Sequence, residues 1–488
     1  MLAAGRPPAA AAALVRRAVD ALGPVRLRRL AVLRPAVVRA ARSAPPWARV
    51  LASRVLVAAD LARLLEHVPV ERDHVGRARW QRDVAQRREW LHGTVTLRRP
   101  DGSVLRQPHR LLWFDPAGDG TVVEALGDVE RAEHLAVFVP GTGSDLHREG
   151  GAVRRMLPLA AAHPGLAVVV WQGADHPDRP FDDGVLPLRE HVVAAAYRDA
   201  ADRAGPVLAA DVTGLQQALP GRDVTVLGHA YGGSIVGSAE VHGMVVDRVV
   251  HVASAGAFAR DLSEYAAPPG RTLRFSLTAE DDSIRLAQGY DADDASDRLR
   301  AMGPRVLDPV DPLWAPVVAG AATRLLGDPQ QVGHGLDPDL LPGVVRLDPG
   351  VHASGRPVRG HSGVFDPGST SWLDLLGVMT KGRVRVLDPG SGRATSSRCR
   401  RTPSRTSWST ARPGPAPARA TAPATRAPGS PGGCSTSPTR ARRRRRARAV
   451  RRDVRAGPGR SPTDRSARVP ARGRHLPESA AWHQRRCP

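Results

Sequence analysis

The sequence predicts an α/β domain with a doubly wound, mostly parallel sheet, preceded by a helical leader and followed by a disordered tail. Short, largely apolar segments alternate with stretches of helical periodicity, which is the pattern of a parallel sheet covered by helices on both faces. The expected parallel strands are 134–139, 166–171, 223–227, 249–252 and 273–277. Three earlier segments separated by Gly- and Pro-containing turns, 94–97, 110–114 and 121–126, predict an antiparallel lead-in.

Charge divides the 488-residue chain into three regions. Residues 1–68 hold 12 Arg and three acids, for a formal charge of +9. Residues 391–488 hold 25 Arg and three acids and carry +22, so residues 69–390 carry −8 although the whole chain carries +23. A high isoelectric point is typical of nucleic-acid-binding proteins. Here the two ends produce it, and no specific nucleic-acid-binding fold is expected.

Residues 1–92 are expected to form a basic helical leader. Prolines would divide it into short helices, at Pro24, Pro35, Pro45 and Pro46. An apolar residue recurs every three or four positions from Trp47 to Val68, which predicts one face of a helix. Two interpretations remain open: the leader packs on the next domain with its arginines in solvent, or it lies on an anionic membrane surface or a partner.

No uncharged apolar run reaches 18 residues, so a transmembrane helix is not expected. The Ala-rich segment 9–15 has no small-residue cleavage site before Arg16 and Arg17, which argues against a signal peptide. A cytoplasmic location is therefore the expectation.

Residues 390–488 form the predicted tail, rich in Arg, Pro and Ser. From 391 onwards its only members of Val, Ile, Leu, Met, Phe and Tyr are Val450, Val454, Val469 and Leu476, too few to offset the entropy of ordering a core. All three cysteines of the chain also lie here, at 399, 434 and 487. The interpretations are out-of-frame translation of a GC-rich gene, inert disorder, or a basic arm that binds phosphate groups.

The candidate site lies at the carboxyl ends of the predicted strands, where doubly wound sheets bind their ligands. Residues 228–232 read Gly-His-Ala-Tyr-Gly directly after a buried strand. This has the form of a nucleophile elbow, G-x-S-x-G, with Ala230 at the position of the serine. The N–H of Tyr231 and the Gly141-Thr142-Gly143 loop would donate hydrogen bonds to an oxyanion.

The acid and the base can be assigned in the chain order nucleophile, acid, base. Asp281 or Asp282 follows the fifth parallel strand, and His361 lies in a Gly-His-Ser-Gly segment. The acid would orient the imidazole, which would deprotonate a serine at position 230. Because Ala230 has no hydroxyl, the alternatives are Ser234, Ser362 or a water activated directly by His361.

This ordered set of motifs resembles a poorly characterised α/β-hydrolase family of GC-rich bacteria, a domain of unknown function, over about residues 95–389. The segments that carry the resemblance are 125–134, 139–143, 168–171, 225–233, 334–338, 360–362 and 365–369. The family pattern implies the α/β-hydrolase fold for residues 93–389, a Gly-His-Ser-Tyr-Gly elbow with a serine nucleophile, and a preference for Asp282 over Asp281. Ala230 departs from that pattern.

Two functions stay open for the predicted domain. One is hydrolysis of an ester, thioester or amide; the other is non-catalytic binding of a small acyl-type ligand. Residues 283–360 would include a lid or insertion that shapes specificity. No cofactor is expected, since the 141–143 loop lacks the third glycine of a dinucleotide-binding loop. No metal is expected either, because His334, His352 and His361 lack ligand-type spacing.

Overall fold

The computed structural model describes residues 8–70, 72–177, 198–286, 334–387 and 394–398. Most of the predicted lid (287–333) and most of the predicted tail (399–488) lie outside the described residues.

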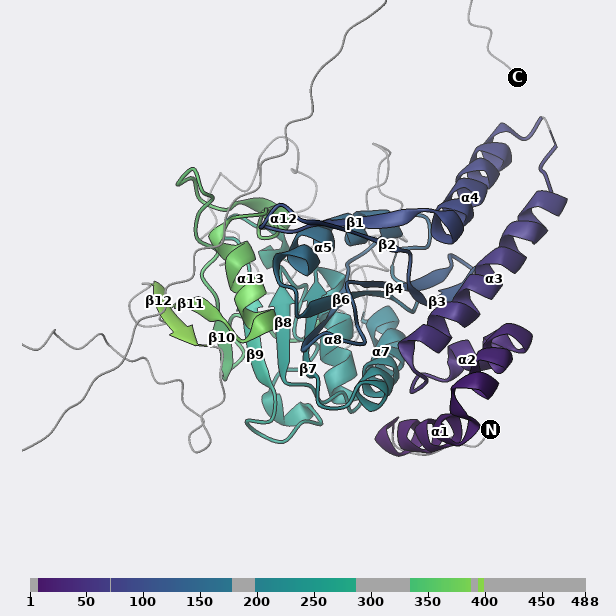
Figure 1. The fold of residues 1–488 in the computed structure, drawn as a ribbon. Helices are drawn as coiled ribbons and strands as arrows, with labels where there is room; N and C mark the ends of the chain where they lie inside the picture. The colour runs from purple at the N-terminus through teal and green to yellow at the C-terminus, as the bar shows by residue number, and fades with distance from the viewer. Residues whose placement is uncertain (1–7, 71, 178–197, 287–333, 388–393, 399–488) are drawn as a thin grey trace, which may run out of the picture. The chain divides into compact units, whose positions relative to one another are not determined.

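An eight-stranded sheet forms the centre of the fold (Figure 1), in the order β10-β9-β8-β7-β5-β6-β4-β3. Its strands are β3 (Leu111–Asp115), β4 (Thr121–Leu126), β5 (His134–Val139), β6 (Leu166–Gln172), β7 (Asp223–His229), β8 (Arg248–Val252), β9 (Leu273–Leu277) and β10 (Val344–Arg346). The strands from β10 to β6 pair in parallel, and β4 and β3 extend the sheet in antiparallel pairing. The predicted doubly wound, mostly parallel α/β fold is confirmed.

Helices cover both faces of the sheet because alternate residues of each strand point to opposite sides. On one side, Phe138 and Val168 belong to a core that includes α5 (Glu149–Ala162) and α13 (Thr370–Thr380). On the other side, Val137 and Val169 belong to a core that includes α7 (Asp199–Ala218) and α8 (Tyr231–Val241). This two-sided burial explains why the parallel strands are almost continuously apolar.

The lead-in differs in one respect from the prediction. The segment at 94–97 becomes β1 (Thr94–Arg98) and pairs with an unpredicted strand, β2 (Val104–Pro108), in a separate antiparallel hairpin. Four of the five β2 residues are exposed, so its sequence lacks the alternation that marks a strand with one buried face.

Four helices form the N-terminal region: α1 (Pro8–Leu33), α2 (Pro35–Ala40), α3 (Pro46–Glu66) and α4 (His74–His92). Breaks fall at the prolines, including a kink inside α1 where Gly23 has φ 66° and precedes Pro24. α1 packs against α7, and α3 packs against β3. The leader therefore packs on the domain, and none of the described helices combines the length and the hydropathy needed to cross a bilayer.

The apolar stripe from Trp47 to Val68 falls on α3 except for its last residue, so the predicted helix is confirmed, but this stripe is not the buried face of α3. The buried positions include Arg49, Ser53 and Asp60, whereas Val68 is 51% exposed and lies beyond the helix end. The buried charges are paired: Asp60 accepts a hydrogen bond from Arg87 Nε of α4 at 3.1 Å. Such pairing lets charged side chains occupy an interface, so the face that packs need not be the most apolar one.

The C-terminal end of the described chain also differs from the prediction. β11 (Arg383–Leu387) pairs antiparallel with β12 (Ala394–Arg398), which lies inside the segment expected to be a disordered tail. Ladder hydrogen bonds use backbone groups, so a polar segment can pair without apolar side chains. Three short helical segments complete the fold: η1 (Leu262–Glu264), η2 (Ser283–Leu286) and α12 (Gly360–Gly363).

Candidate active site

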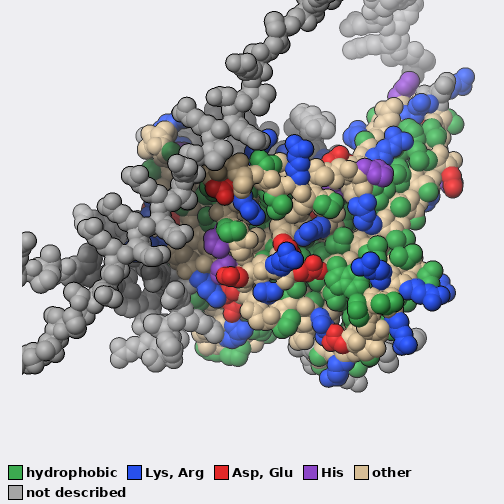
Figure 2. Space-filling view, viewed as in Figure 1, with side chains coloured by type: hydrophobic (Ala, Val, Ile, Leu, Met, Phe, Trp, Pro, Cys, Tyr) green, Lys and Arg blue, Asp and Glu red, His purple; other side chains and the backbone are tan. Residues whose placement is uncertain are grey.

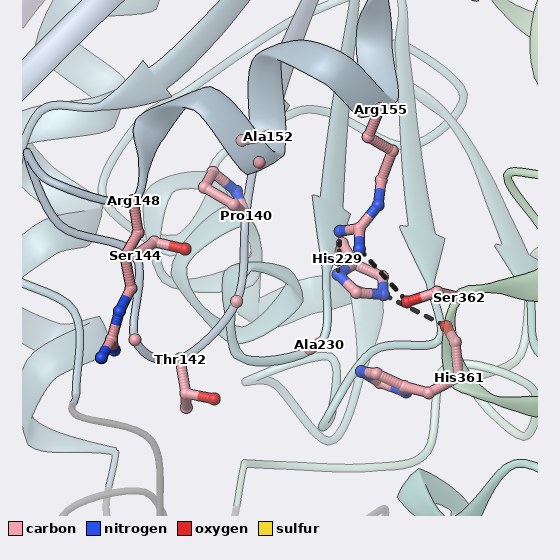
Figure 3. A pocket seen from close by; sticks show the side chains of 13 residues that line it. Pro140, Thr142, Ser144, Arg148, Ala152, Arg155, His229, Ala230, His361 and Ser362 are labelled. Carbon is pink, nitrogen blue, oxygen red and sulfur yellow. Dashed lines mark hydrogen bonds between the residues drawn. The ribbon is translucent and has the colours of Figure 1, made fainter. Parts of the chain in front are cut away.

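A pocket of about 350 Å³ opens at the carboxyl ends of β5 and β7 (Figure 3). In the strand order of the sheet, β5 has β6 as its neighbour on one side and β7 on the other. The chain therefore changes direction across the sheet after β5, and β5 and β7 flank this topological switch point. The crevice at such a point is the usual ligand site of a doubly wound sheet. The lining includes the loop after β5, residues 140–144, and the turn after β7, His229 and Ala230.

Ala230 lies in a strained turn between β7 and α8, with φ 53° and ψ −124°. A positive φ is unfavourable for a residue that carries a Cβ atom, and it persists only where the surroundings enforce it. The backbone N–H of Ala230 donates to the carbonyls of Val252 and Ala253, at 3.2 and 3.1 Å. The turn is thus held by the neighbouring strand end.

Two glycines allow this turn to form close to the sheet. A Cβ atom on Gly232 would lie 2.2 Å from the carbonyl oxygen of Val139, and one on Gly141 would lie 2.7 Å from the Cβ of Ala230. Both distances are too short for any side chain. Close packing around the turn therefore explains both glycines, Gly232 through the backbone of β5 and Gly141 through the Cβ atom of residue 230.

His361 and Asp282 meet across 79 residues of sequence. His361 Nδ1 lies 3.1 Å from each carboxylate oxygen of Asp282. The Asp282 side chain is fully buried, and its Oδ1 also accepts the N–H of Ile284 at 2.9 Å. The His361 side chain is 37% exposed and lines the pocket together with Ala230.

Asp281 has a different set of contacts. Its Oδ1 accepts the N–H of Gly360 at 2.9 Å, and its Oδ2 lies 3.5 Å from Arg359 Nη1. Asp282 is therefore the carboxylate that contacts the imidazole, while Asp281 holds the backbone just before His361. Both acids converge on the start of α12.

The loop after β5 supplies the candidate oxyanion donors. Gly143 has φ 65°, and its N–H donates to the carbonyl of Pro177 at 2.7 Å. That amide is engaged within the protein, so Thr142, which lines the pocket, is the stronger donor candidate of the two. Directly after Ala230, Tyr231 is the first residue of α8, and its hydroxyl accepts the N–H of Ala201 at 3.1 Å.

His229 and Arg155 join the two walls of the pocket, and the sequence analysis assigned neither of them a role. His229 Nε2–H donates to the carbonyl of His361 at 3.2 Å, and Arg155 Nη1 lies 3.4 Å from His229 Nδ1 (Figure 3). Burial, together with electrostatic interactions with His361 and Arg155, lowers the pKa of His229 well below its usual value. This ring is therefore neutral, as its two contacts require. The one signal in the sequence that could have indicated a role for His229 is its position directly before Ala230.

The two substitute nucleophiles considered from the sequence lie in different places. Ser234 is fully buried inside α8 and does not line the pocket. Ser362 does line it, and its hydroxyl accepts a hydrogen bond from Arg155 Nη2 at 3.2 Å. Only Ser362 of this pair is placed to contact a ligand in the pocket.

Comparisons with known proteins agree with this architecture. Residues 115–289 match a family model described as alpha/beta hydrolase. Two uncharacterized Mycobacterium tuberculosis proteins, from strains CDC 1551 and H37Rv, are each 34% identical over 148 residues, which is 27% of this chain and 21% of theirs. The chain thus matches about a fifth of the length of these curated relatives.

The solved structures that match part of the chain include hydrolases of low sequence identity. A dienelactone hydrolase-like promiscuous phosphotriesterase from metagenomic libraries is 17% identical with a TM-score of 0.27, covering 55% of this chain and 95% of that one. The esterase PE8 is 19% identical with a TM-score of 0.23, covering 32% of this chain and 71% of that one. The matched residues 115–289 include β4 to β9, Ala230 and Asp282, and the chain has the alpha/beta-hydrolase fold.

Proposed function

We propose that the domain is a serine-hydrolase scaffold for small ester, thioester or amide substrates in which Ala230 occupies the position of the nucleophile. The native chain then binds acyl-type ligands without forming an acyl-enzyme. The observation that carries this proposal is the contact of His361 Nδ1 with both oxygens of Asp282, at 3.1 Å, in a pocket that Ala230 also lines.

The acid and the base have the properties that general-base chemistry needs. With Nδ1–H donated to Asp282, the Nε2 atom of His361 is the proton acceptor. The buried carboxylate stabilises the imidazolium that forms when the proton arrives. Figure 3 shows the His361 ring extending toward the Ala230 turn, which is where a serine hydroxyl would stand.

The opposite wall offers stabilisation for a developing oxyanion. The N–H groups of Thr142 and Tyr231 are the donors we assign, one from the loop after β5 and one from the start of α8. The helix dipole of α8 places partial positive charge at the same point. A hydroxyl on the Cβ of residue 230 would attack an acyl carbon held between this wall and His361.

A second candidate function is hydrolysis by a water that His361 activates directly. The observation that favours it is the exposure of the imidazole, 37%, in a pocket large enough to hold both a small ligand and water. This route needs no residue at position 230, and it forms no covalent intermediate.

Hydrolysis of p-nitrophenyl acetate and butyrate by the native chain and by Ala230→Ser tests both candidates. We expect the serine variant to be at least about 10³-fold faster, since removal of a triad serine costs on the order of 10⁶-fold in turnover. Calorimetric binding of the unreacted ester by the native chain is the second expected result.

Two outcomes would change the assignment. Turnover by the native chain that His361→Ala abolishes would establish the water route and contradict a binding-only role. No gain in the serine variant, in a chain with unchanged circular dichroism, would contradict the scaffold proposal.

A further inference from the structure

The second half of α1, from Pro24 to Leu33, has two distinct faces. Leu27 and Ala31 are buried, at 3% and 0% exposure, and pack in a cluster with Val38 and Ala48. This inner face attaches the helix to the rest of the N-terminal region. The outer face therefore has a fixed orientation.

The outer face, which we call the basic-apolar face, alternates two kinds of exposed side chain: Val25, Arg26, Arg28, Arg29, Val32 and Leu33. At 100° per residue these six positions fall within an arc of about 160° on one side of the helix. The three apolar members are 82%, 48% and 61% exposed in chain order, and Val37 of α2 extends the face with 59%. Figure 2 shows basic and hydrophobic side chains interspersed over the N-terminal helices.

Single exposed apolar residues are normal on protein surfaces, but a contiguous group of them is informative. The chain segment that carries this group contributes charge of one sign, because the sequence contains no acid between Asp20 and Asp60. Arg28 also packs over the ring of Trp47, at 5.7 Å from its centroid. Its guanidinium is thereby held beside the apolar members.

We propose that the basic-apolar face binds an anionic lipid bilayer. The valines and the leucine would enter the boundary between headgroups and acyl chains, while the arginine stems lie along it and their guanidinium groups reach lipid phosphates. This proposal does not depend on the chemistry of the Ala230 pocket.

Two other occupants fit the face less well. The phosphates of a nucleic acid would bind the arginines of this face, but its backbone has no apolar surface for the two valines and the leucine. The C-terminal segment 391–488 carries +22, so like charges oppose its binding here. A bilayer with anionic lipids satisfies both kinds of side chain.

The region between α3 and α4 provides a matched control. Val68, Val70 and Val75 are 51%, 74% and 81% exposed, so apolar exposure is similar there. Glu66 and Asp73 lie among them, and Asp73 caps α4 by accepting the N–H of Gly76 at 2.8 Å. The mixed charge of this region gives an anionic surface no net attraction.

Co-sedimentation of the full chain with phosphatidylcholine vesicles, with and without phosphatidylserine, tests the proposal. Arg26→Gln/Arg29→Gln should weaken binding to the anionic vesicles roughly 30-fold, from about fivefold per arginine near the surface. Val32→Asn/Leu33→Asn, which changes no charge, should weaken it about tenfold. The control Val70→Asn/Val75→Asn should bind like the native chain.

The basic tail makes a further control necessary, since it can contribute to binding through charge alone. Arg443→Gln/Arg444→Gln removes the same charge as the α1 arginine variant and should have a much smaller effect. Unchanged circular dichroism in each variant, and in Leu33→Asn alone, verifies that these exposed substitutions leave the fold intact.

Three results would overturn the proposal. One is native binding to anionic vesicles that Val32→Asn/Leu33→Asn leaves unchanged, because binding then follows charge alone. Another is no binding of the native chain to these vesicles. The third is a result in which the native chain binds short duplex DNA, the α1 arginine variant does not, and all variants bind vesicles equally. This result would assign the face to nucleic acid.

Discussion

The two walls of the pocket differ in completeness. On one wall, the buried Asp282, which follows β9, contacts the partly exposed His361 of α12 and has a supporting hydrogen bond from the N–H of Ile284. On the wall that follows β7, the backbone of residue 230 is held at φ 53° although its side chain ends at Cβ. Glycine packing and strand-end hydrogen bonds set this turn, so its geometry does not require a hydroxyl at residue 230.

The largest expected effect separates the two acids of the complete wall. In the Ala230→Ser background, Asp282→Asn should lower kcat about 10⁴-fold, because the imidazole loses the partner that fixes its tautomer and stabilises its charge. Asp281→Asn is the matched control, since it contacts only the backbone and Arg359; we expect a loss under about tenfold. Ester hydrolysis measures both, and equal losses would contradict the separate roles of these acids.

The link between the walls gives the next effect. His229→Leu in the same background removes the donor to the His361 carbonyl and should lower kcat about 10- to 100-fold, with a smaller change in KM. His229→Gln, which can restore a donor, should recover part of this loss. If Leu and Gln behave alike, His229 does not position His361 through that hydrogen bond.

A buried histidine of the sheet predicts a dependence of stability on pH. His251, on β8 beside Gly228, is fully buried, and burial lowers its pKa to about 3. Below about pH 6.5 the unfolded chain takes up a proton that the folded ring does not, so stability falls with falling pH by about 1.4 kcal/mol per pH unit.

His251→Leu should therefore reduce the stability lost between pH 7 and pH 5 by about 2 kcal/mol. Urea unfolding at the two pH values measures it, with His74→Gln, at an exposed position, as the control. If the stability of His251→Leu depends on pH as that of the native chain does, His251 is not the source of the stability lost in acid.

The smallest effect concerns the incomplete wall. Ala230→Gly should stabilise the protein by about 1 kcal/mol, because glycine adopts positive φ without the strain of a Cβ atom. Ala239→Gly inside α8 should instead destabilise it by about 1 kcal/mol or more. Urea midpoints compare the pair, and destabilisation by both substitutions would contradict a strained turn at residue 230.

Much of the sheet was predictable because its strands are continuous apolar runs. The five expected parallel strands coincide with β5 to β9 to within two residues at each end. β2 and β10 were missed, since one is mostly exposed and the other has three residues. The buried face of α3 could not be read from the sequence for a different reason: paired charges such as Asp60 and Arg87 are buried, and hydropathy alone cannot indicate pairing.

Only those residues of the candidate site that lie in local sequence motifs could be predicted. The order of Ala230, Asp282 and His361 follows from strand ends and spacing, but these roles stay proposals. The contacts of Arg155 join residues 74 and 207 positions away, and the use of the Gly143 amide by Pro177 depends on the fold of another loop. No local pattern encodes such contacts.

Labelling by a fluorophosphonate probe tests the central claim most directly, because the probe reacts only with an activated serine beside a working base and oxyanion site. The full native chain, Ala230→Ser and Ala230→Ser/His361→Ala are compared in parallel. The account predicts labelling of Ala230→Ser alone. Labelling of the native chain would reveal another reactive serine, and no labelling of Ala230→Ser would show that the wall with Asp282 and His361 is not a functional base; either result contradicts the account.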